Sequence, residues 1–153
     1  MKETLMTRET DAAWLAGIID GEGCICGYWT NRHNKTGGNV HVDVRIQATS
    51  MAMISRVFEI CEKNDIEAYV ETGGLWRPLS TKPTYRIGIR KRAEVSKLFA
   101  LIRPYLVVKL PEVDFAMSWF EKWGDQRGNH QRKAEHDEKI LFFNTLRDLK
   151  KIA

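Results

Sequence analysis

Two carboxylates and two glycines close an apolar segment near the start of the chain. The segment 12–25 reads AAWLAGIIDGEGCI, and its first half has the pattern of a buried helix. The group Asp20-Gly21-Glu22-Gly23 stands where that helix should end. Carboxylate oxygens, and carbonyl oxygens that glycine leaves free to turn, are the ligands that hard divalent cations prefer. The helix end is therefore a candidate metal site.

Small residues line one side of the same helix. Ala13, Gly17 and Gly21 fall at i, i+4 and i+8, and such a ridge lets two helix backbones approach closely. If the partner is an identical helix, the contact is two-fold symmetric and the two acidic ends meet at the axis. Carboxylates brought together repel each other unless a divalent cation lies between them. We therefore predict half of a metal site, completed by a second copy across an interface of Ala13, Trp14, Gly17, Ile18 and Gly21.

The elements that must position this site follow from hydrophobic periodicity. Alternation predicts one hairpin from strands 24–32 and 40–47, and a second from strands 67–73 and 84–91. Helical spacing is found over 51–64, 93–103, 112–123 and 134–150. Residues 1–10 are polar, so we expect a flexible N-terminus with Thr10 or Asp11 as the N-cap of the first helix. The length of 153 residues favours a single domain over 1–153.

Both hairpins place apolar side chains on one face and polar ones on the other. We expect an α+β fold of order αββαββα, with helices covering one face of a four-stranded antiparallel sheet and the other face open. The buried side should hold Val42, Val44, Ile46, Ile87 and Ile89. A twisted antiparallel ribbon fits the major groove of DNA, although an ordinary solvated face has the same pattern. The expected DNA contacts, one of them in the basic loop, are Tyr28, Thr30, Arg32, His41, Asp43, Arg45, Gln47, Arg77, Arg86 and Arg90.

Charge and composition narrow the function classes. The net charge is +4 with a pI near 9.0, and residues 75–92 carry six Lys or Arg with no acid, whereas residues 56–71 carry five acids against two bases. We expect one cationic and one anionic surface. The three cysteines form no CxxC pair, which argues against a disulfide framework or zinc site and favours a reducing, intracellular compartment, cytoplasmic or organellar. No apolar run reaches membrane-spanning length, so no membrane partner is expected.

The stretch LAGIIDGEG over 15–23 resembles the signature of the LAGLIDADG homing endonucleases. It matches that signature at six of nine positions, with conservative changes at Ile18 and Glu22 and a small residue at Gly21. The segment PYLVVK over 104–109 resembles the part of the family that carries its active-site lysine. The likeness extends over residues 12–150 and includes the αββαββα order.

The resemblance implies a role for each matching residue. Glu22 matches the acidic metal ligand, and Gly21 matches the position whose carbonyl also faces the metal, for which Mg²⁺ is expected and Mn²⁺ or Ca²⁺ can substitute. Lys109 matches the basic residue near the scissile phosphate. Either Ser50 or Gln47 matches the polar residue that positions the water, with Ser50 favoured by spacing. Asp20 is interpreted as structural, capping or orienting the motif end.

The implied activity is metal-dependent hydrolysis of phosphodiester bonds, which requires no protein nucleophile. A single motif implies a homodimer that makes a double-strand break at a long, roughly palindromic target in double-stranded DNA, in the service of intron or intein mobility. Two alternatives on the same fold remain open, an RNA-splicing maturase and a DNA-binding protein without cleavage activity. Retention of Glu22 and Lys109 argues against the second alternative.

Overall fold

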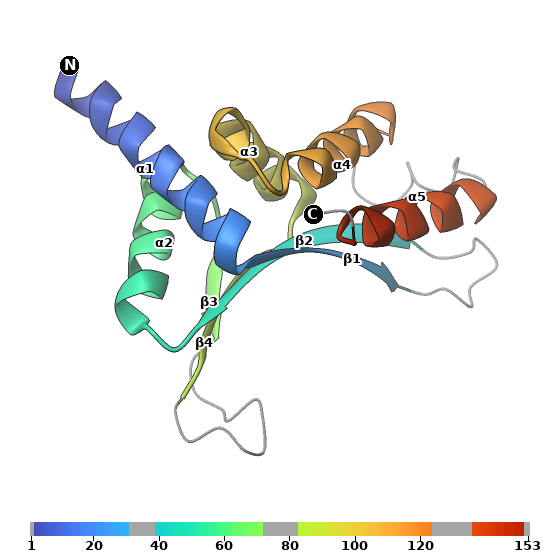
Figure 1. Cartoon of the computed structure of the whole chain (residues 1–153), viewed down its shortest axis with the longest axis horizontal. Helices are drawn as coiled ribbons and strands as arrows, with labels where there is room; N and C mark the ends of the chain where they lie inside the picture. The colour runs from blue at the N-terminus through green and yellow to red at the C-terminus, as the bar shows by residue number, and fades with distance from the viewer. Residues whose placement is uncertain (1, 31–38, 72–82, 124–135, 152–153) are drawn as a thin grey trace.

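The order of helices and strands in the described residues follows the hydrophobic pattern of the sequence. A computed structural model describes residues 2–30, 39–71, 83–123 and 136–151. Two hairpins separate the first three long helices, which is the predicted αββαββα order, and two further helices follow (Figure 1). The elements are α1 (Lys2–Glu22), β1 (Gly23–Thr30), β2 (Asn39–Ala48), α2 (Met51–Lys63), β3 (Tyr69–Glu71), β4 (Tyr85–Ile89), α3 (Arg92–Ile102), the 3-10 turn η1 (Arg103–Tyr105), α4 (Leu110–Trp123) and α5 (His136–Leu149).

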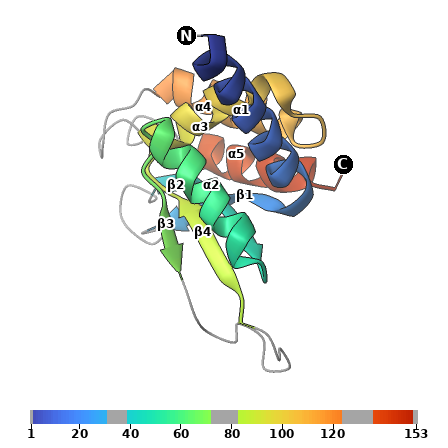
Figure 2. The ribbon, with the colours of Figure 1, turned by 90° about the vertical axis from the view of Figure 1, so that its left-hand side faces the viewer.

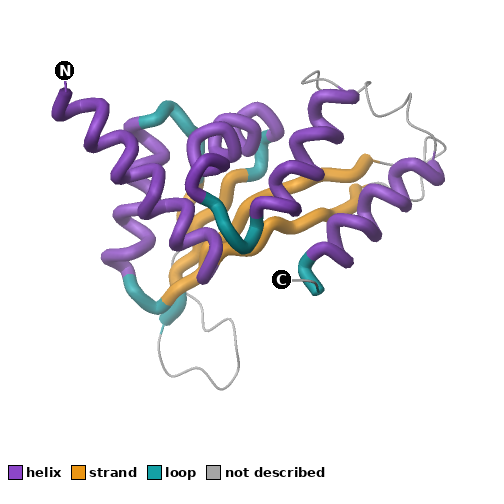
Figure 3. The backbone as a smooth tube through the Cα atoms, turned by 45° about the horizontal axis from the view of Figure 1, so that its top comes forward, coloured by secondary structure: helices purple, strands orange, loops and turns teal. Residues whose placement is uncertain are grey.

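The four strands form one antiparallel sheet in the order β1-β2-β4-β3, so that β1 and β3 are its edges. All described helices lie on the same side of this sheet, and its other face is open among the described residues (Figures 1 and 3). The predicted α+β fold, with helices on one face and an open second face, is confirmed. The hairpin of β1 and β2 extends beneath α4 and α5, whereas α2 covers the other end (Figure 2).

The core forms where the alternating apolar residues of the strands meet the helices. Val42, Val44, Ile46, Ile87 and Ile89 are all buried, as the alternation predicts. From α1, the buried side chains that join this core are Ala12, Leu15, Ala16 and Ile19. Burial on this scale, at roughly 25 cal/mol per Å² of apolar surface, holds the sheet and the helices in one arrangement.

The start of α1 differs from the expectation. The helix begins at Lys2, so the prediction of an N-cap at Thr10 or Asp11 is wrong. Asp11 is buried within the helix, and its carboxylate forms an ion pair with Arg56 of α2. The Asp11 carboxylate, expected to cap the start of α1, is instead paired with a side chain of a different helix.

Among the described residues, none of the helices combines the length and the apolar character needed to cross a bilayer.

Candidate functional site

The sharp junction between α1 and β1 places the acidic motif at the edge of the sheet. A Cβ at Gly23 would lie 2.8 Å from both the Cα and the carbonyl oxygen of Ile19. No side chain fits at that separation, so the chain can turn back against its own helix only with glycine at this position. The last turn of α1 therefore ends beside the first residue of β1.

Asp20 connects the end of α1 to the segment before α4. Its carboxylate accepts hydrogen bonds from the backbone N–H of Val107 at 2.8 Å and from that of Lys109 at 2.9 Å. In return, Nζ of Lys109 donates to the backbone carbonyl of Asp20 at 2.7 Å. Charge-assisted hydrogen bonds of this kind are short and strong. The contacts agree with the interpretation of Asp20 as a structural residue, and they bring Lys109 to the motif end.

Glu22 and Gly21 lie exposed at the same helix end. Within the described residues, no hydrogen bond or ion pair holds the Glu22 carboxylate. The last carbonyls of any helix lack partners inside the helix, and Gly21 contributes one of them. Oxygen donors of these two kinds suit Mg²⁺. The described residues contain no cluster of three or more His, Cys, Asp or Glu side chains that could hold a metal.

The two candidates for the water-positioning residue differ in their surroundings. Gly23, which follows Glu22, pairs with Ile46, which precedes Gln47 on β2. The Gln47 side-chain oxygen accepts a hydrogen bond from Arg86 at 3.2 Å. Ser50 instead caps α2, where its hydroxyl accepts from the backbone N–H of Met53 at 3.2 Å. The two side chains therefore differ in their contacts, with Gln47 bonded to Arg86 across the sheet and Ser50 bonded to the start of α2.

The small-residue ridge of α1 faces away from the core. Ala13 and Gly17 are exposed, Trp14 is 38% exposed, and Ile18 is half-buried. A Cβ built on Gly17 or Gly21 would meet no atom of the described chain within 4 Å. The predicted interface residues therefore share one accessible face, which the fold of a single chain leaves uncovered.

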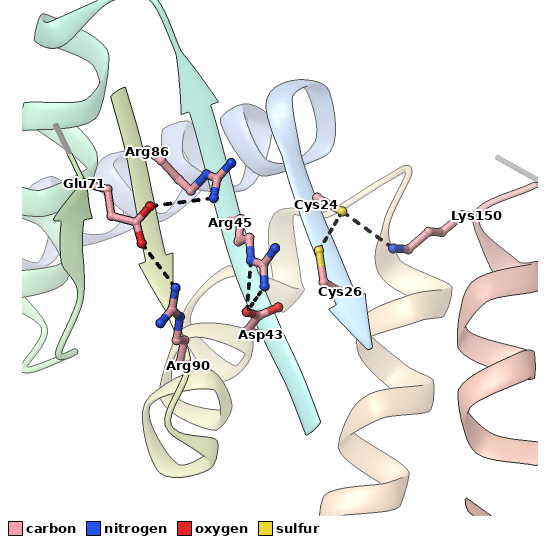
Figure 4. A network of polar contacts seen from close by, with 8 residues as sticks. All are labelled: Cys24, Cys26, Asp43, Arg45, Glu71, Arg86, Arg90 and Lys150. Carbon is pink, nitrogen blue, oxygen red and sulfur yellow. Dashed lines mark hydrogen bonds and ion pairs between the residues drawn. The ribbon is translucent and has the colours of Figure 1, made fainter. Parts of the chain in front are cut away.

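Arginines on the open sheet face are held by acids on the same strand or on a neighbouring strand (Figure 4). Arg45 lies 2.9 Å from Asp43, and Arg90 lies 3.3 Å from Glu71. Arg86 approaches Glu71 at 3.7 Å. The guanidinium of Arg90 also covers the Tyr69 ring, 4.3 Å from its centroid. Ion pairs and stacking of this kind restrict the rotamers of long side chains, so the arginines project from the sheet in defined positions.

Asp43 departs from its expected role. It belongs to the outward-pointing set of β2, yet its side chain is completely buried beneath its neighbours. The structure corrects the prediction of a direct DNA contact here, because the carboxylate orients Arg45 and is not itself accessible.

A second group of predicted contacts lies at the far end of the first hairpin. Tyr28 and His41 are paired across the strands and stack with ring centroids 5.0 Å apart. The Thr30 hydroxyl is 2.9 Å from Nε2 of His41. Burial lowers the pKa of His41, and the positive charge of Arg92 adds to this effect, so the neutral ring is favoured. Arg32 and Arg77 lie outside the described residues.

The acidic and basic segments do not form two separate surfaces in the described chain. Glu67 pairs with Lys91 at 2.7 Å, and Glu71 pairs with two arginines of the open face. Because strand pairing brings residues 67–71 beside 86–91, the acids neutralise part of the basic segment. Arg77 and Lys82, which also entered the expectation of a cationic surface, lie outside the described residues.

Lys150 and Cys24 form a polar contact near the motif that the sequence did not predict. Nζ of Lys150, just beyond α5, lies 3.6 Å from Sγ of Cys24, at a sequence separation that no local pattern detects. The Cys24 and Cys26 sulfurs are 3.0 Å apart, and this contact, with the charge of Lys150, lowers the pKa of Cys24.

Glu112 in the first turn of α4 is only 3% exposed, and one of its oxygens has no hydrogen-bond partner within the described residues. Burial raises the pKa of Glu112, although the charges of Lys150 and Lys109 oppose the shift.

Comparison with solved structures identifies the fold. The homing endonuclease I-CvuI, in complex with the I-CreI target, matches 94% of this chain and 83% of its own with a TM-score of 0.73 and 16% identity. The I-SmaMI LAGLIDADG homing endonuclease bound to cleaved DNA matches 89% of this chain, but only 42% of its own, with a TM-score of 0.62 and 15% identity. The archaeal intron-encoded homing endonuclease I-Vdi141I, complexed with DNA, matches 89% of this chain and 96% of its own with a TM-score of 0.55 and 14% identity.

At sequence level, neither a protein-family model nor a curated protein matches the chain. The three-dimensional likeness therefore establishes a shared fold at an identity too low to carry over an activity. The chain has the fold of LAGLIDADG homing endonucleases.

Proposed function

We propose that this chain is a site-specific endonuclease that cleaves double-stranded DNA by metal-dependent hydrolysis of phosphodiester bonds. One observation carries the proposal: Glu22, an exposed carboxylate without a partner among the described residues, ends the same helix to which Asp20 fixes Lys109. An acid that only stabilised the fold would be expected to have a partner. The likeness to DNA-bound homing endonucleases supports the same reading, and intron or intein mobility is the biological role we infer from it.

The proposed active form is a homodimer, with one active site for each DNA strand. The exposed ridge of α1 supports this assembly, because a second identical ridge would bring two copies of Glu22 together. Two carboxylates and two Gly21 carbonyls would then offer a set of oxygen ligands that neither chain offers alone. A two-fold axis also requires a roughly palindromic target.

Each residue of the proposed site has a separate task. Glu22 and the Gly21 carbonyl would hold Mg²⁺, or Mn²⁺ or Ca²⁺ in its place. When bound, the ion activates water for attack and stabilises the departing oxygen. Gln47 accepts from Arg86 through its oxygen, which leaves its amide group free to hydrogen-bond and orient a water molecule.

Lys109 would stabilise the charge that develops on the phosphate. An ammonium has three donors, and Lys109 uses one of them on the Asp20 carbonyl. The remaining donors can face the substrate from a position that is already fixed, which is the arrangement that lowers the barrier to charge development.

DNA would bind across the open face of the sheet. The proposed contacts are the outward side chains of three adjacent strands, with Asp43 acting through Arg45. Arginine donates two parallel hydrogen bonds to guanine, so prior orientation of the guanidinium favours base recognition over phosphate contact alone. These proposed contacts are Tyr28, Thr30, His41, Arg45, Gln47, Arg86 and Arg90. Arg32 and Arg77, which lie outside the described residues, are proposed as further contacts.

The proposal is tested by a plasmid that carries the genomic sequence flanking the gene, with the gene-bearing insertion deleted. In magnesium the protein should linearise this plasmid, and chelation of the metal should abolish cleavage. Glu22→Gln should remove cleavage while retaining gel-shift binding, because the amide keeps the shape but not the anionic ligand. Glu62→Gln, an exposed change on α2, is the matched control and should cleave normally.

Two results would contradict the proposal. Cleavage by the Glu22→Gln variant at the wild-type rate would remove Glu22 from the metal site. Binding of the intron RNA, without nicking or cleavage of either DNA strand, would instead favour a maturase.

A further inference from the structure

A pair of thiols lies on the open face of the edge strand β1. Cys24 and Cys26 are two residues apart, so their side chains leave the strand on the same side. Their sulfurs are 3.0 Å apart and Cys24 is exposed. Figure 4 shows the two sulfur atoms turned toward each other, with Lys150 beyond Cys24. Neither cysteine has a part in the proposed cleavage reaction.

The backbone spacing permits a bond between these two sulfurs. Two residues of a strand span about 6.6 Å between Cα atoms, which is within the 4.4–6.8 Å found across disulfides. Because a disulfide is about 2.05 Å long, the sulfurs must approach by about 1 Å from their present contact. The strand β1 has a neighbour on one side only, so it can bend toward the solvent to allow this movement.

The surroundings distinguish Cys24 from the other cysteines. Cys24 is exposed to solvent, and the ammonium of Lys150 lies 3.6 Å from its sulfur. Cys61 is 1% exposed inside the core, where an oxidant in solution cannot reach it. Cys26 is half-buried, and of the two other cysteines only Cys24 lies within contact distance of its sulfur.

We propose that Cys24 and Cys26 are a modification site, at which a peroxide oxidises the two thiols to an intramolecular disulfide. The Cys24 sulfur attacks one oxygen of hydrogen peroxide, so that an S–O bond forms and the O–O bond breaks. The departing hydroxide takes the thiol proton and leaves as water. The Cys26 sulfur then attacks the Cys24 sulfur, forming the S–S bond and breaking the S–O bond, and a second water leaves with the Cys26 proton. The two thiols lose two electrons, and the peroxide gains them.

Thiol counting on the folded full-length protein tests this site without any DNA. After treatment with hydrogen peroxide, unfolding and alkylation, the number of alkylated thiols should fall from three to one, with an intact-mass loss of two hydrogen atoms before alkylation. Peptide mapping should place the bond between Cys24 and Cys26. The Cys61→Ala variant is the control and should still lose both of its remaining thiols.

Single variants separate the two steps. Cys26→Ser should stop at the sulfenic acid of Cys24, which dimedone traps as a covalent adduct, and should form no intramolecular bond. Retention of all three thiols in the wild-type protein would overturn the proposal. Oxidation of Cys24 to the sulfinic acid without loss of the Cys26 thiol would overturn it equally, as would a bond that maps to Cys61 or joins two chains.

Discussion

Asp20 and Lys109 hold each other through both main-chain and side-chain atoms, although they are 89 residues apart in sequence. The Asp20 carboxylate accepts from the Lys109 backbone N–H at 2.9 Å, while the Lys109 ammonium donates to the Asp20 carbonyl at 2.7 Å. Asp20 lies in the last turn of α1, and Lys109 is the residue before α4. These two hydrogen bonds therefore hold the end of α1 beside the start of α4. The proposed metal ligand, Glu22, follows Asp20 by two positions.

Asp20→Asn should therefore impair both stability and cleavage. The amide retains one acceptor oxygen, but it loses the charge and presents N–H donors to a backbone N–H. Loss of a charge-assisted hydrogen bond costs on the order of 1–3 kcal/mol, to be measured by urea unfolding. Cleavage of the flanking-sequence plasmid should fall more than the loss of folded protein explains, because Lys109 is displaced.

Asp114→Asn is the matched control for that experiment. Asp114 forms an exposed ion pair with Arg103 on the same part of the fold. Exposed pairs contribute about 0–1 kcal/mol, so this variant should resemble the wild-type protein in both assays. Equal losses from the two substitutions would contradict the special role of Asp20.

Gly17→Leu should yield a folded monomer. A Cβ at this position meets no atom of its own described chain within 4 Å, so a single chain tolerates the larger side chain. Between two close helix backbones the same side chain has no room. Sedimentation should show loss of the dimer, while circular dichroism shows retained helix. Ala52→Leu, an exposed change on α2, should leave the dimer intact. A fully dimeric and active Gly17→Leu protein would place the interface elsewhere.

Arg45→Ala and Val44→Ala should differ in their effect on DNA binding, since the two residues are adjacent on β2 but point to opposite faces. Val44 is fully buried, and its truncation should destabilise the protein by on the order of 2 kcal/mol without changing target preference. Arg45→Ala should weaken DNA binding, and it should also lower the melting temperature, because it leaves the buried Asp43 carboxylate without its ion-pair partner.

The size and pattern of the Arg45 effect identify its contact. A base contact predicts a loss of about 1–3 kcal/mol on the preferred target and relaxed preference at one base pair of each half-site. A phosphate contact predicts a similar loss on every sequence and a flatter salt dependence. Unchanged binding affinity on all sequences would remove Arg45 from the interface.

Glu112→Gln should change how stability depends on pH. Burial raises the pKa of this carboxyl in the folded state above its value in the unfolded chain. The unfolded state therefore ionises first, and the wild-type protein loses stability as pH rises from the ordinary glutamate pKa to the raised one. The glutamine variant has no such group, so its stability relative to wild type should be greater at pH 7 than at pH 4. Urea unfolding at both pH values measures this, and Glu121→Gln, exposed on the same helix, should show no such change.

Sequence alone determined the architecture because its signals are local. The alternation over residues 40–47 places successive side chains on opposite faces of a strand, whatever that strand pairs with. Val44 and Ile46 are accordingly buried, and Arg45 and Gln47 lie on the open face. The motif over 15–23 likewise predicted a helix that ends in acid and glycine, and Gly23 is the residue whose close approach to Ile19 requires that ending.

Only the tertiary structure decided which polar residues contact one another. Asp43 has the same alternation as Arg45, but packing across the sheet buries it and converts it from an expected contact to a support for Arg45. Strand register pairs Ile46, the neighbour of Gln47, with Gly23 at the motif end, whereas Ser50 is occupied as a helix cap. The contact of Lys150 with Cys24 joins the residue after α5 to the start of β1. Such contacts depend on how helices and strands dock, and that docking is set by the shape of the whole core and not by the period of any one segment.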